Sequence, residues 1–307
     1  MLNLILWFIK NSEGITIFDK CILFFLKIIY LGLRILLRLA LGKKRRDRFY
    51  VKRGLDFGVF WYKTFKFLKP GNSTLLKFKV PKYDYEFYCR INKDDFKIMT
   101  IHEDDIITRF TTKEGDIVID IGAHIGLYTI ISSKRVGAQG KVVAIEADPE
   151  NFEMLNSNIK LNQLTNVIPL NYAVFSKETK IKLYLPEVES GFTKYKTIMP
   201  NWINTQEKFV EVNANTLDYL LQLNQIRQEE VNWIKIDVEG AEFEVLKGAT
   251  NVLSKSKDIA LLIEVHGLDN YRPILEFLRL YNFKIEFEKT YESGEKHIIL
   301  RKSGSTI

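Results

Sequence analysis

Residues 116–129 read DIVIDIGAHIGLYT, and this stretch decides the fold. Its apolar, β-branched first half (116–121) is typical of a buried strand. The strand leads straight into a glycine-rich turn and the start of a helix. Gly122 is expected to let the backbone turn tightly beneath a ligand, and Gly126 to let the helix begin close to the sheet. The stretch therefore predicts the first strand, turn and helix of a ligand-binding α/β domain.

Strands and helices alternate from Gly115 onward, which indicates a mostly parallel sheet with helices on both faces. The last two expected strands flank Ser293-Gly294-Glu295 with no helix between them, so they must pair as an antiparallel hairpin. That ending is typical of the Rossmann-like class I methyltransferase sheet and unusual for NAD-binding Rossmann domains. The expected strands are 116–121, 141–146, 166–170, 232–237, 259–265, 283–288 and 297–301.

The glycine-rich turn differs from a dinucleotide-binding fingerprint. That fingerprint reads Gly-x-Gly-x-x-Gly, whereas the spacing here is Gly-x-x-x-Gly with His124 in the middle. The glycine that lets a pyrophosphate approach is missing, which favours S-adenosylmethionine (SAM) over NAD. Asp120 is placed to meet the amino group of such a zwitterionic ligand. A purely structural glycine turn is the alternative.

An acidic residue ends the next expected strand. Glu146 lies 20 residues after Gly126, where a carboxylate can accept hydrogen bonds from both ribose hydroxyls. Asp148-Pro149 then begins a helix, with Asp148 as its N-cap. The alternative is that Glu146 is merely a solvated carboxylate at a strand end.

A second acidic segment, IKIDVEGAE (234–242), ends the fourth parallel strand. Asp237 and Glu239 lie at the sheet edge where ligands bind. They are candidates to hold a divalent metal, to orient SAM or to accept a proton from a substrate hydroxyl. For Glu239 and Glu242 the alternative is a favourable charge at a helix N-terminus. His266 follows the fifth strand at the same edge and is a candidate general base, since its reference pKa is about 6.5. A structural histidine is the alternative there.

Several ordered segments resemble the FkbM family of SAM-dependent O-methyltransferases: DIGAHIGLYT, AIEADPENFEMLNSNIKLN, NYAV, TLDYL, WIKIDVEGAEFEVLKGA and IEVHG. The resemblance covers roughly residues 111–267 and implies methyl transfer to a hydroxyl, often on a sugar or a polyketide. His124 stands where the family often has Asn, and Ala147-Asp148 where it often has Pro-Asn. The cofactor-binding residues that we expect are Asp120, Gly122, His124, Gly126, Glu146, Ala147, Ala173 and Asp237. The acidic signature that matches the family is Asp237, Glu239 and Glu242.

Positive charge is concentrated at the N-terminus. The net charge is +7, but residues 1–53 hold 12 Lys/Arg against 3 Asp/Glu, a balance of +9, which leaves −2 for the remainder. A nearly neutral catalytic domain has no electrostatic footprint for gripping nucleic acid, so we expect no nucleic-acid partner. Residues 21–41 predict a helix with a wide apolar face and one cationic stripe, followed by the basic cluster at 43–46.

Three placements of that helix are open. It can span a bilayer, lie in the plane of an anionic membrane surface, or pack on the catalytic domain or on a second copy. The in-plane placement explains the single stripe directly. Cys21 and Cys89 form no disulfide framework, which favours a reducing compartment. We therefore expect a cytoplasmic protein at a membrane, peripheral or monotopic, with a single spanning helix as the alternative.

The chain is expected to have three parts. Residues 1–48 form the N-terminal helical segment. Residues 49–112 form a β-rich lead-in, in which LLKFKV and YEFYCRI look like paired strands, and residues 113–302 form the methyltransferase domain. The long insertion at 186–209 contains several aromatic residues and is either a lid over the site or a packing element.

The sequence thus predicts SAM-dependent O-methylation of a glycan or glycolipid-like acceptor, with His266 or Asp237 as the base. A divalent metal at Asp237 and Glu239 is a further candidate feature. The alternatives are a non-catalytic SAM-fold binding module and an NAD-dependent oxidoreductase.

Overall fold

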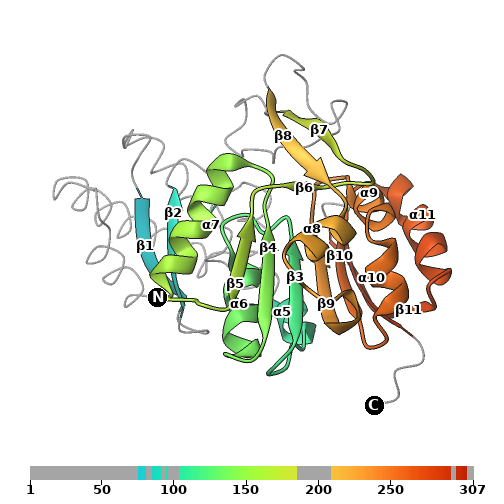
Figure 1. Cartoon of the computed structure of the whole chain (residues 1–307), viewed down its shortest axis with the longest axis horizontal. Coiled ribbons are helices and arrows are strands. Elements are labelled where there is room, and N and C mark those ends of the chain that lie inside the picture. Colours follow the sequence, from blue (N-terminus) through green and yellow to red (C-terminus); the bar gives the residue numbers. More distant parts are fainter. Residues whose placement is uncertain are drawn as a thin grey trace, which may run out of the picture. The chain divides into compact units, whose positions relative to one another are not determined.

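The computed structural model of the 307-residue chain describes residues 75–80, 85–90, 95, 104–184, 209–291 and 295–302 (Figure 1). These residues belong to two compact units, which are described separately. The first unit contains the strands between 75 and 90, and the second contains the described residues in 104–184 and 209–302.

The first unit contains an antiparallel strand pair, which confirms the pair that the sequence predicts. Strand β1 (Leu75–Val80) pairs with β2 (Tyr85–Arg90), with Val80 opposite Tyr85. At the end of β2, the Arg90 guanidinium donates hydrogen bonds to both carboxylate oxygens of the buried Asp95, at 2.8 and 2.9 Å. The arrangement satisfies two charges that would be costly to bury alone.

The second unit is built on a seven-stranded sheet in the order β11-β12-β10-β9-β3-β4-β5 (Figure 1). The five strands from β10 to β5 are parallel, and β12 runs antiparallel to both of its neighbours. This is the mostly parallel sheet that the sequence predicts, including its antiparallel ending. The strands are β3 (Ile117–Ile121), β4 (Lys141–Ile145), β5 (Val167–Leu170), β9 (Val231–Ile236), β10 (Ala260–Val265), β11 (Phe283–Thr290) and β12 (Lys296–Lys302).

Helices follow most of these strands. In Figure 1, α9 to α11 gather beside the orange and red part of the sheet. The α-helices of this unit are α5 (Asp104–Arg109), α6 (Leu127–Val136), α7 (Pro149–Leu161), α8 (Leu217–Leu223), α9 (Glu242–Lys247), α10 (Thr250–Lys255) and α11 (Leu268–Arg279). Helix α7 begins as the sequence predicts: the Asp148 carboxylate accepts a hydrogen bond from the Glu150 backbone N–H at 2.9 Å, and Pro149 occupies the first turn.

A small third sheet, absent from the strands that the sequence predicts, has the order β6-β8-β7. It consists of β6 (Ala173–Val174), β7 (Thr179–Tyr184) and β8 (Phe209–Asn215), and β7 and β8 project beyond the main sheet at the top of Figure 1. Tyr184 pairs with Phe209, so the two strands flank the predicted insertion. Residues 185–208, which make up nearly all of that insertion, lie outside the described residues.

The predicted N-terminal helix at 21–41 and its basic cluster also lie outside the described residues. Among the residues that are described, no helix is long and apolar enough to cross a membrane. The expectation that this chain meets a membrane therefore stays a prediction.

Candidate active site at the carboxyl edge of the sheet

The turn after β3 is held by a close backbone contact. Gly122 has a φ of +73°, and a methyl group added to it would lie 1.7 Å from the carbonyl oxygen of Asp237. The Asp237 backbone N–H donates to the carbonyl of Ile121 at 3.1 Å. Glycine is therefore required at 122 because the end of β9 presses against it. The contact of Gly122 with the Asp237 carbonyl, and not only the approach of a ligand, excludes any larger residue at 122.

Glu146 fastens this turn to the start of α7. Its two oxygens accept hydrogen bonds from the backbone N–H of His124 at 2.7 Å and of Asp148 at 2.9 Å. Glu146 is buried, and this burial raises the pKa of its carboxyl. His124 itself has a φ of +53°, which is uncommon for a residue other than glycine. The structure therefore contradicts the alternative of a freely solvated carboxylate at 146.

Asp120 lies beneath the turn and is only 1% exposed. Its Oδ2 accepts a hydrogen bond from the Thr129 hydroxyl at 2.6 Å, which links β3 to the first turn of α6. Its Oδ1 has no hydrogen-bond partner among the described residues, although the Lys235 ammonium lies 3.7 Å away. Burial raises the pKa of Asp120, despite the opposing effect of Lys235. Holding the turn is thus one role of Asp120, whatever it contacts in a ligand.

Lys235 is a site residue that the sequence analysis does not single out. It is buried in β9, and its ammonium donates hydrogen bonds to the Gly122 carbonyl at 3.0 Å and to Asp237 Oδ2 at 3.2 Å. One cation therefore joins the glycine turn to the acidic segment. A lysine inside an otherwise apolar strand, as in NWIKID, is the signal that points to a buried charge partner.

The two alanines of the expected cofactor site lie together in a small apolar cluster. Ala173 is buried with Leu183, Val212 and Ala214, and Ala147 packs against this group. The cluster joins the turn after β4 to the third sheet. Gly126, at the start of α6, has a φ of +102°.

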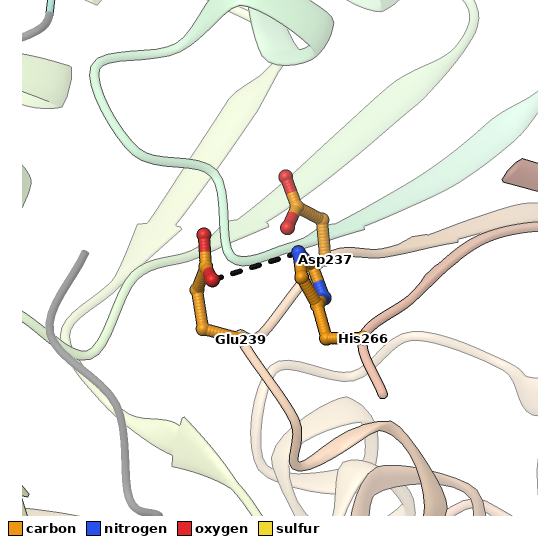
Figure 2. Close-up of side chains that lie close together, drawn as sticks. All are labelled: Asp237, Glu239 and His266. Atoms are coloured by element: carbon orange, nitrogen blue, oxygen red, sulfur yellow. Dashed lines mark ion pairs between the residues drawn. The ribbon is translucent and has the colours of Figure 1, made fainter. Parts of the chain in front are cut away.

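Asp237, Glu239 and His266 come together as the sequence predicts for one sheet edge, and Figure 2 shows their side chains converging. Asp237 follows β9 and His266 follows β10. Glu239 has a φ of +51°, so the chain turns between the two carboxylates instead of staying extended. The Nε2 atom of His266 lies 3.5 Å from Glu239 Oε2.

The imidazole of His266 is held among several carboxylates. Its Nδ1 lies 2.8 Å from Oε1 of Glu242, a side chain in the first turn of α9 that is 0% exposed. Burial by itself lowers the pKa of His266, but the hydrogen bond with Glu242 and the nearby carboxylates of Glu264, Glu239 and Asp237 outweigh burial and raise the pKa to about 12. These carboxylates therefore favour the protonated form of the imidazole.

Glu264 and His297 complete the same network. The Nε2 atom of His297 lies 2.8 Å from Glu264 Oε2, and the two residues are directly opposite in the antiparallel pair of β10 and β12. Although burial opposes the shift, the nearby imidazoles of His266 and His297 hold the pKa of Glu264 well below its usual range. The sequence analysis leaves His297 aside because only the strand register brings it to this edge.

The chain matches a family profile over the part that contains these site residues. The profile described as "Methyltransferase FkbM domain" matches residues 120–285, more than half of the chain. The match begins at Asp120, takes in the acidic segment and His266, and ends within β11.

Relatives of known name match this chain over part of their length. Hexuronic acid methyltransferase AglP of Haloferax volcanii is 31% identical over 159 residues, 51% of this chain and 59% of that protein. Methyltransferase 1 of Beauveria bassiana is 25% identical over 149 residues, 44% of this chain and 59% of that protein. The chain thus spans about three fifths of the length of these curated relatives.

Among solved structures, the chain is similar to methyltransferase FkbM from Methylobacillus flagellatus KT. The TM-score is 0.45 at 15% identity, over 63% of this chain and 45% of that chain. It is also similar to TYW2 of M. jannaschii in complex with AdoMet, with a TM-score of 0.42 at 21% identity, over 75% of this chain and 86% of that chain.

Proposed function

We propose that this chain, which belongs to the FkbM methyltransferase family, transfers the methyl group of SAM to a hydroxyl of a glycan or glycolipid-like acceptor. The observation that carries the proposal is the arrangement around Glu146. A buried carboxylate at the end of β4 ties the glycine turn to α7, at the position where this fold meets a ribose.

The residues at the sheet edge fit SAM. Each oxygen of Glu146 accepts one backbone hydrogen bond, and an ionised carboxylate has about four lone-pair sites, so acceptor capacity remains for ribose hydroxyls. Oδ1 of Asp120 is a buried acceptor with no hydrogen-bond partner among the described residues, and it suits the cationic amino group. The residues that we assign to the SAM site are Asp120, Gly122, His124, Gly126, Glu146, Ala147, Ala173 and Asp237.

The chemistry that we propose is a direct displacement. When bound, SAM supplies an electrophilic methyl group on a sulfonium. The acceptor oxygen forms a bond to that methyl carbon, the carbon–sulfur electron pair stays on sulfur, and the hydroxyl proton passes to a side chain of this protein. Asp237 and His266 are the proposed candidates for the proton acceptor, because both lie at this edge of the sheet. The main task of the protein is to place the reacting oxygen in line, which can supply a large part of the rate.

A sugar hydroxyl is the proposed acceptor group. AglP, by its name, acts on a hexuronic acid, and it shares 31% identity with this chain over the matched part. We also propose that the basic, apolar N-terminal segment holds the enzyme at the cytoplasmic face of a membrane. An acceptor on a lipid carrier would then diffuse in two dimensions beside the enzyme.

Calorimetric titration with SAM tests the proposed cofactor site. Glu146→Ala should weaken SAM binding by about 1.5–3 kcal/mol, the usual contribution of a hydrogen bond to a charged group. Glu153→Gln removes an exposed acid on α7 and is the matched control, which should bind SAM as the wild type does. Circular dichroism checks that both variants are folded. Equal affinity in wild type and a folded Glu146→Ala variant would contradict the assignment.

Turnover tests the activity itself. The protein is incubated with SAM that carries an isotope-labelled methyl group and with a panel of membrane glycans. Mass spectrometry should then detect a labelled product and S-adenosylhomocysteine. SAM binding with no turnover on any acceptor would favour the non-catalytic binding module. Binding of NAD in place of SAM would favour the oxidoreductase.

A further inference from the structure

Three side chains of different chemistry converge at the edge of the sheet. Asp237, Glu239 and His266 each offer one ligand atom, and these atoms lie within 4.8 Å of one another (Figure 2). Two carboxylates and an imidazole make up a mixed oxygen and nitrogen ligand set. Such a set is what borderline divalent metal ions prefer.

The spacing of these atoms suits a shared cation better than a hydrogen bond. His266 Nε2 lies 3.5 Å from Glu239 Oε2 and 3.5 Å from Glu264 Oε1. Both separations exceed the roughly 2.7–3.2 Å of an N–H···O hydrogen bond. Two ligands bound about 2.1 Å from one ion are about 3.0 Å apart at a right angle and about 3.4 Å apart at a tetrahedral angle. A small movement of Glu239 therefore suffices to place both atoms on one ion.

The other ring nitrogen of His266 provides a second, independent observation. Nδ1 lies 2.8 Å from Oε1 of the fully buried Glu242, and the same oxygen accepts a hydrogen bond from the Gly240 backbone N–H at 2.9 Å. Histidines that bind metals almost always donate their second ring nitrogen to a carboxylate or carbonyl, which fixes the ring. Here the contact with Glu242 orients the ring so that Nε2 faces the carboxylates of Asp237 and Glu239. The remaining oxygen of Glu242 is buried with no hydrogen-bond partner among the described residues.

Several carboxylates lie close to the imidazole. Glu239, Glu242 and Glu264 lie within 3.5 Å of its nitrogens, and oxygens of Asp237 and Glu295 lie within 4.8 Å of it. Lys235, which contacts Asp237, also faces Asp120 and is therefore shared between two acids of this edge. A divalent cation would be attracted to this group of carboxylates.

We propose that Asp237, Glu239 and His266 bind one divalent cation of the Mn²⁺ or Zn²⁺ kind, with Glu242 orienting the imidazole. Mg²⁺ should bind more weakly because it favours oxygen ligands over imidazole. The role of the cation rests on the proposed function: it would take the acceptor hydroxyl as a further ligand and make its proton more acidic. Cation binding itself needs neither SAM nor an acceptor.

Electron paramagnetic resonance of Mn²⁺ added to the metal-free, full-length protein tests the proposal. The wild type should bind one Mn²⁺ per chain, and pulsed measurements should show the ¹⁴N modulation of a coordinated imidazole. Glu239→Gln should weaken Mn²⁺ binding at least about tenfold, and Glu242→Gln should weaken it by about 10–100-fold through the histidine. Glu153→Gln removes the same charge from the exposed face of α7 and should bind Mn²⁺ as the wild type does.

Each outcome decides the matter. No Mn²⁺ binding by the wild type at millimolar concentration, or binding without nitrogen modulation, overturns the proposal without any variant. Equal binding by Glu239→Gln and Glu153→Gln overturns it as well. If Glu239→Gln does not fold, the nitrogen signal of the wild type and its loss in His266→Gln decide instead. Failure of the proposed methyl transfer would appear separately, as a protein that binds Mn²⁺ but neither binds SAM nor turns it over.

Discussion

Replacing Gly122 by alanine measures how firmly the glycine turn and the acidic segment are pressed together. Alanine at a positive φ destabilises the folded state by about 1–2 kcal/mol. Alanine also lowers the conformational entropy of the unfolded chain, which stabilises the protein by roughly 0.4–1 kcal/mol. At Gly122 the new methyl group would also meet the Asp237 carbonyl oxygen at 1.7 Å. Relief of such an overlap in a packed core costs about 1–3 kcal/mol or more. We expect Gly122→Ala to lower the free energy of unfolding by roughly 3 kcal/mol.

Gly115 provides the matched control for this measurement. Its φ is +85°, and no heavy atom lies within 4 Å of an added methyl group, so Gly115→Ala isolates the conformational term. That variant should lose only about 1 kcal/mol. Urea unfolding of both variants and the wild type gives the two differences. If Gly122→Ala and Gly115→Ala are equally stable within about 0.5 kcal/mol, the backbone contact does not constrain the turn and the reasoning fails.

Three further predictions concern other parts of the chain. Asp148→Ala should lower the free energy of unfolding by about 0.5–2 kcal/mol because α7 loses its cap, whereas Asp148→Asn should keep most of it; equal losses in urea unfolding would argue against capping. Burial raises the pKa of the Cys89 thiol well above its usual value. In a Cys21→Ser variant, Cys89 should therefore react with a maleimide at pH 8 much more slowly in the native protein than in the protein unfolded in urea. Equal rates in the two states would refute this. Full-length protein should float with anionic vesicles, less at high salt, and lose this property when residues 1–48 are deleted; flotation of the truncated protein would assign membrane binding to another surface.

The sequence predicts most of the sheet because its parallel strands are short apolar runs between clear turn residues. The antiparallel ending follows from the absence of a helix between 283–288 and 297–301, and the structure confirms it. The start of α7 is equally local, since Asp148 and Pro149 are enough to define it. Strands β7 and β8 are missing from the prediction, although Lys180, Ile181, Lys182 and Leu183 alternate in polarity as an amphipathic strand does.

The site is only partly predictable, because its polar contacts depend on register and on contacts between strands. The sequence places Asp237, Glu239 and His266 at one edge, and the structure brings them together. Pairing Glu264 with His297 requires the register of β10 against β12, which the apolar pattern of those strands does not define. The position of Lys235 between Asp120 and Asp237 likewise depends on β9 lying next to β3.

The pairing of Tyr184 with Phe209 has a consequence for how the length of this chain can change in evolution. The chain leaves β7 and re-enters β8 at neighbouring positions, so whatever joins them begins and ends at one place. Closing a longer connection costs only about 0.6 kcal/mol for each doubling of its length. Residues can therefore be gained or lost between 184 and 209 without altering the register of any strand in the main sheet. A change in length there leaves in place both the proposed SAM site and the proposed cation site.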